Sequence, residues 1–126
     1  MRLFDNIVRS YLGPAQYAEP KFRYLNRSGR IEVDRIRQEL ERWFSRYPNA
    51  GKRDLRERFR STSNSNHQSA FFELFLHELL LKLGCMVEIH PETNTGMRKR
   101  PDFLVKPPKV GRFYMEARLE RSGCLI

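Results

Sequence analysis

The sequence predicts an α+β fold, with a helical N-terminal region over residues 1–65 and an αβββ unit over residues 66–126. Three observations lead to this prediction. Apolar residues of the N-terminal region recur every three or four positions, as on an amphipathic helix. A nearly continuous apolar segment then ends at Gly84. The remaining residues alternate apolar and polar side chains in short segments separated by turn residues, which is typical of β-strands.

The N-terminal region is predicted to contain three helices. The first has a helical apolar period and ends at Gly13, and the second carries one long apolar stripe that ends at Pro48, since proline interrupts helices. The third has the same spacing over a shorter length. The predicted helices span residues 3–12, 33–47 and 54–59, with a short extended piece at residues 22–24 and a loop at residues 61–65.

The C-terminal region is predicted to be one buried helix followed by three strands. The helix is apolar on nearly all sides, and Gly84 stands where a helix C-terminus favours glycine. In the third strand, the period of two places Glu116 and Arg118 on one face. The predicted helix spans residues 69–83, and the predicted strands span residues 85–90, 102–106 and 112–120.

The charge of the chain favours a polyanionic partner. The 126 residues, enough for one domain, include 24 Lys and Arg against 15 Asp and Glu, a net charge of +9. Such an excess attracts nucleic acid, although it also serves general solubility. Arg98, Lys99 and Arg100 form a basic cluster that is predicted to contact a phosphate backbone, the alternative being a plain charged loop.

Other classes of protein are not indicated. The two cysteines, Cys85 and Cys124, lie far apart and form no CxxC pair, so neither a zinc knuckle nor a disulfide framework is expected. No apolar run approaches the about 20 residues needed to cross a membrane. The first ten residues carry charges within their apolar stretch, unlike a signal peptide. We therefore expect a cytoplasmic protein with no membrane contact. The sequence does not indicate the oligomeric state.

Two carboxylates are predicted to lie on neighbouring strands. Asp102 begins the second predicted strand and Glu116 lies on the third. Because neighbouring strands are only about 4.8 Å apart, the two could share a Mg²⁺ ion, which one or two carboxylates commonly hold. Such an ion would polarise a phosphodiester and lower the pKa of a bound water. Glu73, with His77 one turn later, adds a polar strip to the preceding helix.

These residues also carry a family resemblance. Pro101-Asp102 followed by a hairpin and Glu116-Ala117-Arg118 resembles the PD-(D/E)XK signature of the restriction-endonuclease-like nucleases. The αβββ context over residues 66–120 is that of the superfamily core. The Phe71-Phe72-Glu73, His90-Pro91 and Arg100-Pro101-Asp102 segments more closely resemble longer bacterial proteins of this type.

The resemblance implies an incomplete restriction-endonuclease-like core and a Mg²⁺- or Mn²⁺-dependent nuclease acting on DNA. It implies metal binding by Asp102 and Glu116, with Arg118 and Glu73 completing the catalytic group. Arginine stands at the position where the signature has lysine, and it cannot give up a proton to act as a base. Lys82 and Lys99 are candidates for a relocated lysine.

The resemblance further implies a helix and a strand after residue 120, which the chain does not contain. We therefore expect the chain as given to show little nuclease activity.

Several alternatives remain open from the sequence. The module could be a degenerate nuclease fold that binds nucleic acid or a protein partner without cleavage. Glu73 and Glu78 could be exposed helix positions, with Glu78 paired to Lys82 one turn later. His77 is more readily explained as a core or surface histidine than as a metal ligand.

Overall fold

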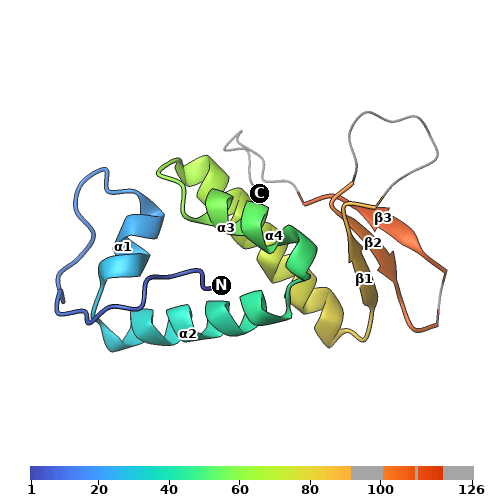
Figure 1. Cartoon of the computed structure of the whole chain (residues 1–126), viewed down its shortest axis with the longest axis horizontal. Coiled ribbons are helices and arrows are strands. Elements are labelled where there is room, and N and C mark those ends of the chain that lie inside the picture. The colour runs from blue at the N-terminus through green and yellow to red at the C-terminus, as the bar shows by residue number, and fades with distance from the viewer. Residues whose placement is uncertain (92–100, 110, 118–126) are drawn as a thin grey trace, which may run out of the picture.

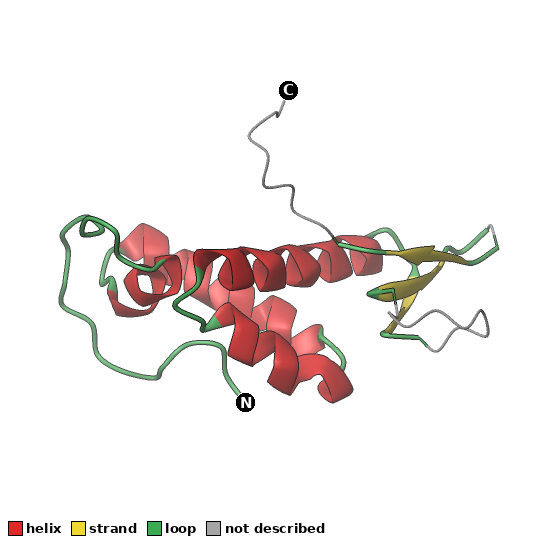
Figure 2. Ribbon diagram, turned by 90° about the horizontal axis from the view of Figure 1, so that it is seen from above, coloured by secondary structure: helices red, strands yellow, loops and turns green. Residues whose placement is uncertain are grey.

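The computed structural model describes residues 1–91, 101–109 and 111–117, and these form a mixed α+β fold. Figures 1 and 2 show the helices gathered at one end of the molecule and a small sheet at the other. The helices are α1 (Lys21–Arg27), α2 (Ile31–Arg46), α3 (Asn49–Phe59) and α4 (Asn64–Lys82), and the strands are β1 (Met86–Ile89), β2 (Phe103–Lys106) and β3 (Phe113–Met115).

The first helix predicted from the sequence is not formed. Residues 3–12 contain no helix, and Leu3 and Phe4 are buried in the core beside α2 and α3. Their main-chain N–H groups donate to the Glu41 carboxylate of α2, at 2.9 and 3.1 Å. A side chain thus supplies the acceptors that a helix would supply, while Val8 and Leu12 of the expected apolar face stay exposed.

Residues 22–24, predicted to be extended, lie within helix α1. An alternation over only three residues does not distinguish the period of a strand from that of a helix. In the structure Phe22 is a buried helical residue, and its ring centroid lies 5.7 Å from that of Phe4 and 5.8 Å from that of Phe59. The second predicted helix is confirmed as α2, which ends two residues before Pro48. The third is confirmed but begins earlier, because α3 starts directly after this proline.

Helix α4 is confirmed and is longer than predicted. It begins at Asn64, inside the expected loop, because the Ser63 hydroxyl accepts a hydrogen bond from the Asn66 N–H at the N-cap. At the other end Gly84 adopts a left-handed conformation with φ +82°. The N–H groups of Gly84 and Cys85 donate to the carbonyls of Leu81 and Leu80, the Schellman arrangement that ends many helices.

The three strands form an antiparallel sheet in the order β1-β2-β3. Val87 pairs with Val105 and Phe103 pairs with Met115, and these side chains pack on the core. β3 ends at Met115, five residues before the predicted end, and residues 118–120 lie outside the described part. Because Phe103 faces Met115, the same register continued by one residue sets Asp102 opposite Glu116.

One hydrophobic cluster joins the helices to the sheet. It includes Leu3 and Phe59 from the N-terminal region and Leu74, Phe103 and Val105 from the C-terminal region. The predicted division at residues 65 and 66 falls within the first turn of α4. No helix formed by the described residues has both the length and the apolarity that a bilayer crossing requires.

Helix α4 buries polar side chains and exposes apolar ones. Glu73, His77 and Glu78 are 2–4% exposed, whereas Phe71, Phe75 and Leu79 are 38–41% exposed. The expectation of a largely buried helix is therefore wrong for one face, and the alternative of an exposed Glu73 and Glu78 is wrong as well. Glu78 pairs with Arg46 of α2, at 2.8 Å, and not with Lys82.

Candidate functional site

Two carboxyl groups meet where α4 packs against the sheet. Glu73 lies in the middle of α4 and is 4% exposed, and Asp102 directly precedes β2. The Asp102 main chain is held to the end of β1, because its carbonyl accepts from the His90 N–H at 2.9 Å. Its carboxylate accepts from the Ala117 N–H at 2.7 Å and is thereby held to the end of β3.

Glu73 lies beside Asp102 and is ion-paired to an arginine of another helix. Arg58, in the last turn of α3, contacts the Glu73 carboxylate through Nη2, and the same nitrogen lies 3.0 Å from Asp54. The arginine side chain is 27% exposed, while that of Glu73 is 5% exposed. One guanidinium therefore links the exposed Asp54 carboxylate to the buried Glu73 carboxylate.

The electrostatics of Glu73 are unusual for a glutamate. Burial raises its pKa from the ordinary value of 4.5 to about 7, because the charged form loses its hydration. The ion pair with Arg58 opposes this change. The neighbouring Asp102 carboxyl adds to it, both by repulsion and by the hydrogen bond between the two groups. A carboxyl with a pKa near neutrality beside a second carboxyl is typical of functional sites, although structural networks also produce it.

Two further side chains close the site on the core side. Tyr47, which follows α2, is 3% exposed, and its ring lies 4.9 Å from the His77 ring. Burial, and then the charge of Glu73, raise the pKa of Tyr47, so its hydroxyl stays protonated. His77 is 2% exposed, and its Nδ1 has no hydrogen-bond partner among the residues that the structure describes. Burial lowers the pKa of His77.

The predicted metal ligands are only partly brought together. The register sets Asp102 opposite Glu116 at the ends of adjacent strands, but the Glu116 side chain is exposed while Glu73 is buried. Within residues 1–91, 101–109 and 111–117, no three or more His, Cys, Asp or Glu side chains gather closely enough to share a metal ion. Of the predicted site residues, Asp102 lies close enough to Glu73 to act on its charge.

The other predicted residues do not join this pair. Arg118, the basic cluster Arg98-Lys99-Arg100 and, with it, the candidate lysine Lys99 lie outside the described residues. Lys82 is exposed at the end of α4, and its charge acts on Glu39 of α2.

Sequence reasoning missed Arg58 and Tyr47. The sequence did contain a signal for Arg58, because this residue follows Leu55 by three positions and directly precedes Phe59, and both of these are fully buried. A helix position between two buried ones lies at the border of the buried face. Tyr47 was recognised as an apolar position of the second helix, and nothing local indicated that it would lie beside a carboxyl pair.

Comparison of the chain with protein-family models, with curated proteins and with solved structures gave no match.

Proposed function

We propose that the chain is a nuclease-like module in which Glu73 and Asp102 hold Mg²⁺ or Mn²⁺ and act on DNA phosphodiesters. The observation that carries this proposal is the pair formed by the buried Glu73 carboxyl and the half-buried Asp102 carboxyl, which α4 and the start of β2 bring together. A second carboxylate beside a buried one destabilises the charged forms of both, unless a cation lies between them.

The donor set fits a hard divalent cation. Mg²⁺ takes oxygen ligands and is commonly held by one or two carboxylates together with several waters. Glu73 and Asp102 supply two carboxylates from different elements, and the hydrogen bond from the Ala117 N–H orients one of them. Glu116, opposite Asp102 in the continued register, is a candidate third ligand.

A cation bound there would supply Lewis-acid chemistry, by neutralising charge on a phosphodiester and activating a water. The residues of the chain would do the rest. Arg58 lies beside the pair and could contact a phosphate oxygen through its fork of N–H donors. Tyr47 and the core behind it exclude water from one side of the carboxyl pair. The net charge of +9 would favour association with DNA.

A second function is favoured by the same arginine. Arg58 already neutralises Glu73, so its guanidinium can replace a metal ion permanently. In that case the module binds nucleic acid or a protein partner without cleavage. The two functions differ in whether the carboxyl pair binds a divalent cation.

Calorimetric titration with Mn²⁺ tests the proposal. The wild-type chain should bind Mn²⁺, and Glu73→Gln and Asp102→Asn should both abolish binding. Glu78→Gln is a matched control, because Glu78 lies on the same helix, is equally buried and is also paired to an arginine. Binding that survives both site variants, or that the control loses equally, would refute the carboxyl pair as a metal site.

Two further measurements separate the two functions. Nicking of plasmid DNA in Mg²⁺ is expected to be weak for the chain as given; nicking that depends on Glu73 and Asp102, but not on Glu78, supports a nuclease. If the wild type binds no Mn²⁺ but Arg58→Gln does, the guanidinium occupies the site and the binding module is supported.

A further inference from the structure

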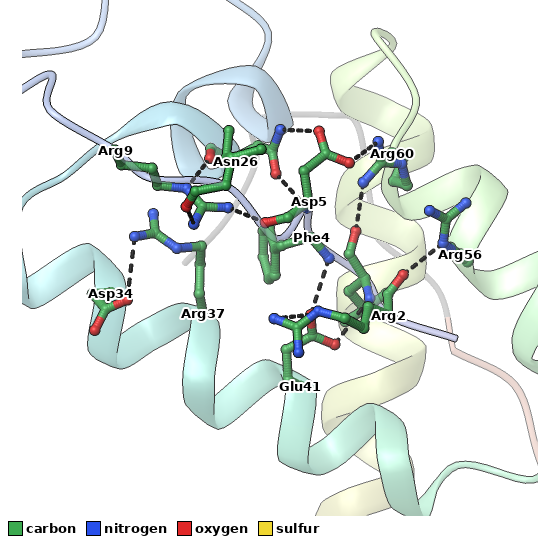
Figure 3. A network of polar contacts seen from close by, with 12 residues as sticks. Arg2, Phe4, Asp5, Arg9, Asn26, Asp34, Arg37, Glu41, Arg56 and Arg60 are labelled. Atoms are coloured by element: carbon green, nitrogen blue, oxygen red, sulfur yellow. Dashed lines mark hydrogen bonds and ion pairs between the residues drawn. The ribbon is translucent and has the colours of Figure 1, made fainter.

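A second cluster of charged side chains lies between the N-terminal segment, residues 2–12, and α2 (Figure 3). A cleft of about 270 Å³ opens there, and its charged lining residues are Arg2, Arg9, Arg37, Arg42, Asp34 and Glu41. A neighbouring cleft of the same volume shares Arg9, Asp34 and Arg37. We propose that the first cleft binds a phosphate group.

The two arginines at the centre of the cluster lie close together without a carboxylate for each. Arg37 is 5% exposed, and burial, followed by the nearby charge of Arg9, lowers its pKa. The Arg37 Nη1 donates to the carbonyls of Leu25 and Ser28, both at 2.7 Å, while the Asp34 carboxylate is 3.4 Å from Nη2. Backbone oxygens thus position this guanidinium more closely than its acid does.

Arg9 is held in the same way. Its guanidinium donates to the main-chain oxygens of Asp5, Ile7 and Asn26, and none of the carboxylates in the described part of the chain lies within ion-pair distance of it. Three of the five N–H donors of an arginine are thereby used, and two remain. Main-chain carbonyls fix the orientation of the group but do not neutralise it, so its charge stays available to a ligand.

The two acids of the cleft are already engaged. The Glu41 carboxylate accepts from the N–H groups of Leu3 and Phe4 and pairs with Arg2 at 3.6 Å. The Asp34 carboxylate accepts from Gln38 at 2.9 Å as well as from Arg37. Four arginines against these two acids leave a net charge of +2 on the lining. An anion is the ligand that this balance requires.

The size and chemistry of the cleft favour phosphate. A volume of about 270 Å³ is below the range of pockets for drug-sized organic ligands, which begins at roughly 300 Å³. Arginine forks match the tetrahedral oxygens of phosphate, to which they can donate two parallel hydrogen bonds. The phosphate could belong to a nucleic-acid backbone or be free in solution. This inference does not depend on the proposed metal site, which lies on other elements.

The test compares two exposed arginines of matched environment. Arg42 lines the cleft, is 57% exposed and pairs with Glu39 three residues earlier. Arg53 on α3 lines neither cleft, is 87% exposed and pairs with Glu57 four residues later. Arg42→Gln and Arg53→Gln therefore remove the same charge from a helix surface. Neither side chain donates a hydrogen bond to the main chain in the described structure, so both variants should fold.

Thermal unfolding of the full chain is measured with increasing inorganic phosphate, against sodium chloride at matched ionic strength. Bound phosphate should raise the unfolding temperature of the wild type and of Arg53→Gln by mass action. The apparent affinity of Arg42→Gln should be at least about tenfold weaker, as expected for the loss of a charge-assisted hydrogen bond. Phosphate is also generally excluded from protein surfaces, and this effect should raise the unfolding temperature of all three proteins by the same amount. An equal response in all three would overturn the proposal.

A labelled DNA duplex then distinguishes the two sources of phosphate. If Arg42→Gln weakens duplex binding more than Arg53→Gln does, the cleft takes a backbone phosphate. If both variants bind the duplex equally, and the response to inorganic phosphate is still selectively lost in Arg42→Gln, the ligand is a free phosphate.

Discussion

Replacing Glu73 with glutamine should make the protein more stable at alkaline pH. The folded carboxyl has a pKa of about 7, against an ordinary value of 4.5. Between these two pH values the folded chain binds a proton that the unfolded chain has released. Stability is therefore highest below about pH 4.5 and is lost as the pH rises through about 7. Glutamine is a neutral mimic of the protonated acid, so the variant should not lose this stability.

The size of the effect follows from the same two values. At about 1.36 kcal/mol per pKa unit, the difference between 4.5 and about 7 corresponds to about 3 kcal/mol. For a chain of 126 residues this is about 10 °C in the unfolding temperature. Glu73→Gln should exceed the wild type by up to this amount at about pH 8, and the two should converge below about pH 4.5.

The assay is urea denaturation across this pH range, followed by circular dichroism in the presence of a chelator. Glu78→Gln provides the contrast, because it removes two hydrogen bonds from Arg46, of 2.8 and 3.0 Å, and should cost about 1–3 kcal/mol. A Glu73→Gln variant that is less stable than the wild type at alkaline pH would refute the reasoning. It would mean that the ion pair with Arg58 outweighs burial and the repulsion from Asp102.

Three other changes test the packing. Gly29→Ala should cost about 1–3 kcal/mol in urea denaturation, because its Cβ would lie 2.8 Å from the main-chain oxygen of Arg9; Gly111→Ala, with nothing within 4 Å, should be neutral. Phe59→Ala should cost about 3–5 kcal/mol, since this ring is fully buried; a loss below 1 kcal/mol would contradict the packing. Burial lowers the pKa of His67 below 6.5, so the stability of the fold should decrease as the pH drops below about 6.5. In His67→Gln, thermal unfolding measured across this pH range should no longer show that decrease.

The sequence predicted best those elements whose signals are local. The apolar stripe of α2 and the proline after it defined that helix, and Gly84 defined the end of α4 through a conformation that glycine adopts readily. The failure at residues 3–12 has a non-local cause. Glu41 and Arg60, far along the chain, satisfy the backbone groups of this segment, and no pattern within ten residues contains that information.

The candidate site was predictable in part for the same reason. Glu73 was predicted because few polar residues interrupt its apolar helix, and Asp102 because it begins a strand next to that of Glu116 and resembles a nuclease signature together with Pro101. The contact between Glu73 and Asp102 depends on how the sheet packs on α4, and the contribution of Arg58 depends on how α3 packs there too. The buried polar face of α4 was hidden because phenylalanine and leucine occupy its exposed side.

The N-terminal segment has a consequence for the order in which the protein folds. Leu3 and Phe4 are synthesised before the groups that hold them, because Glu41 and Arg60 follow 37 to 57 residues later. Such contacts form late, because the intervening loop must first be closed. During synthesis the segment exposes two apolar side chains that have no partner yet, so a chaperone or a premature contact has its best opportunity there.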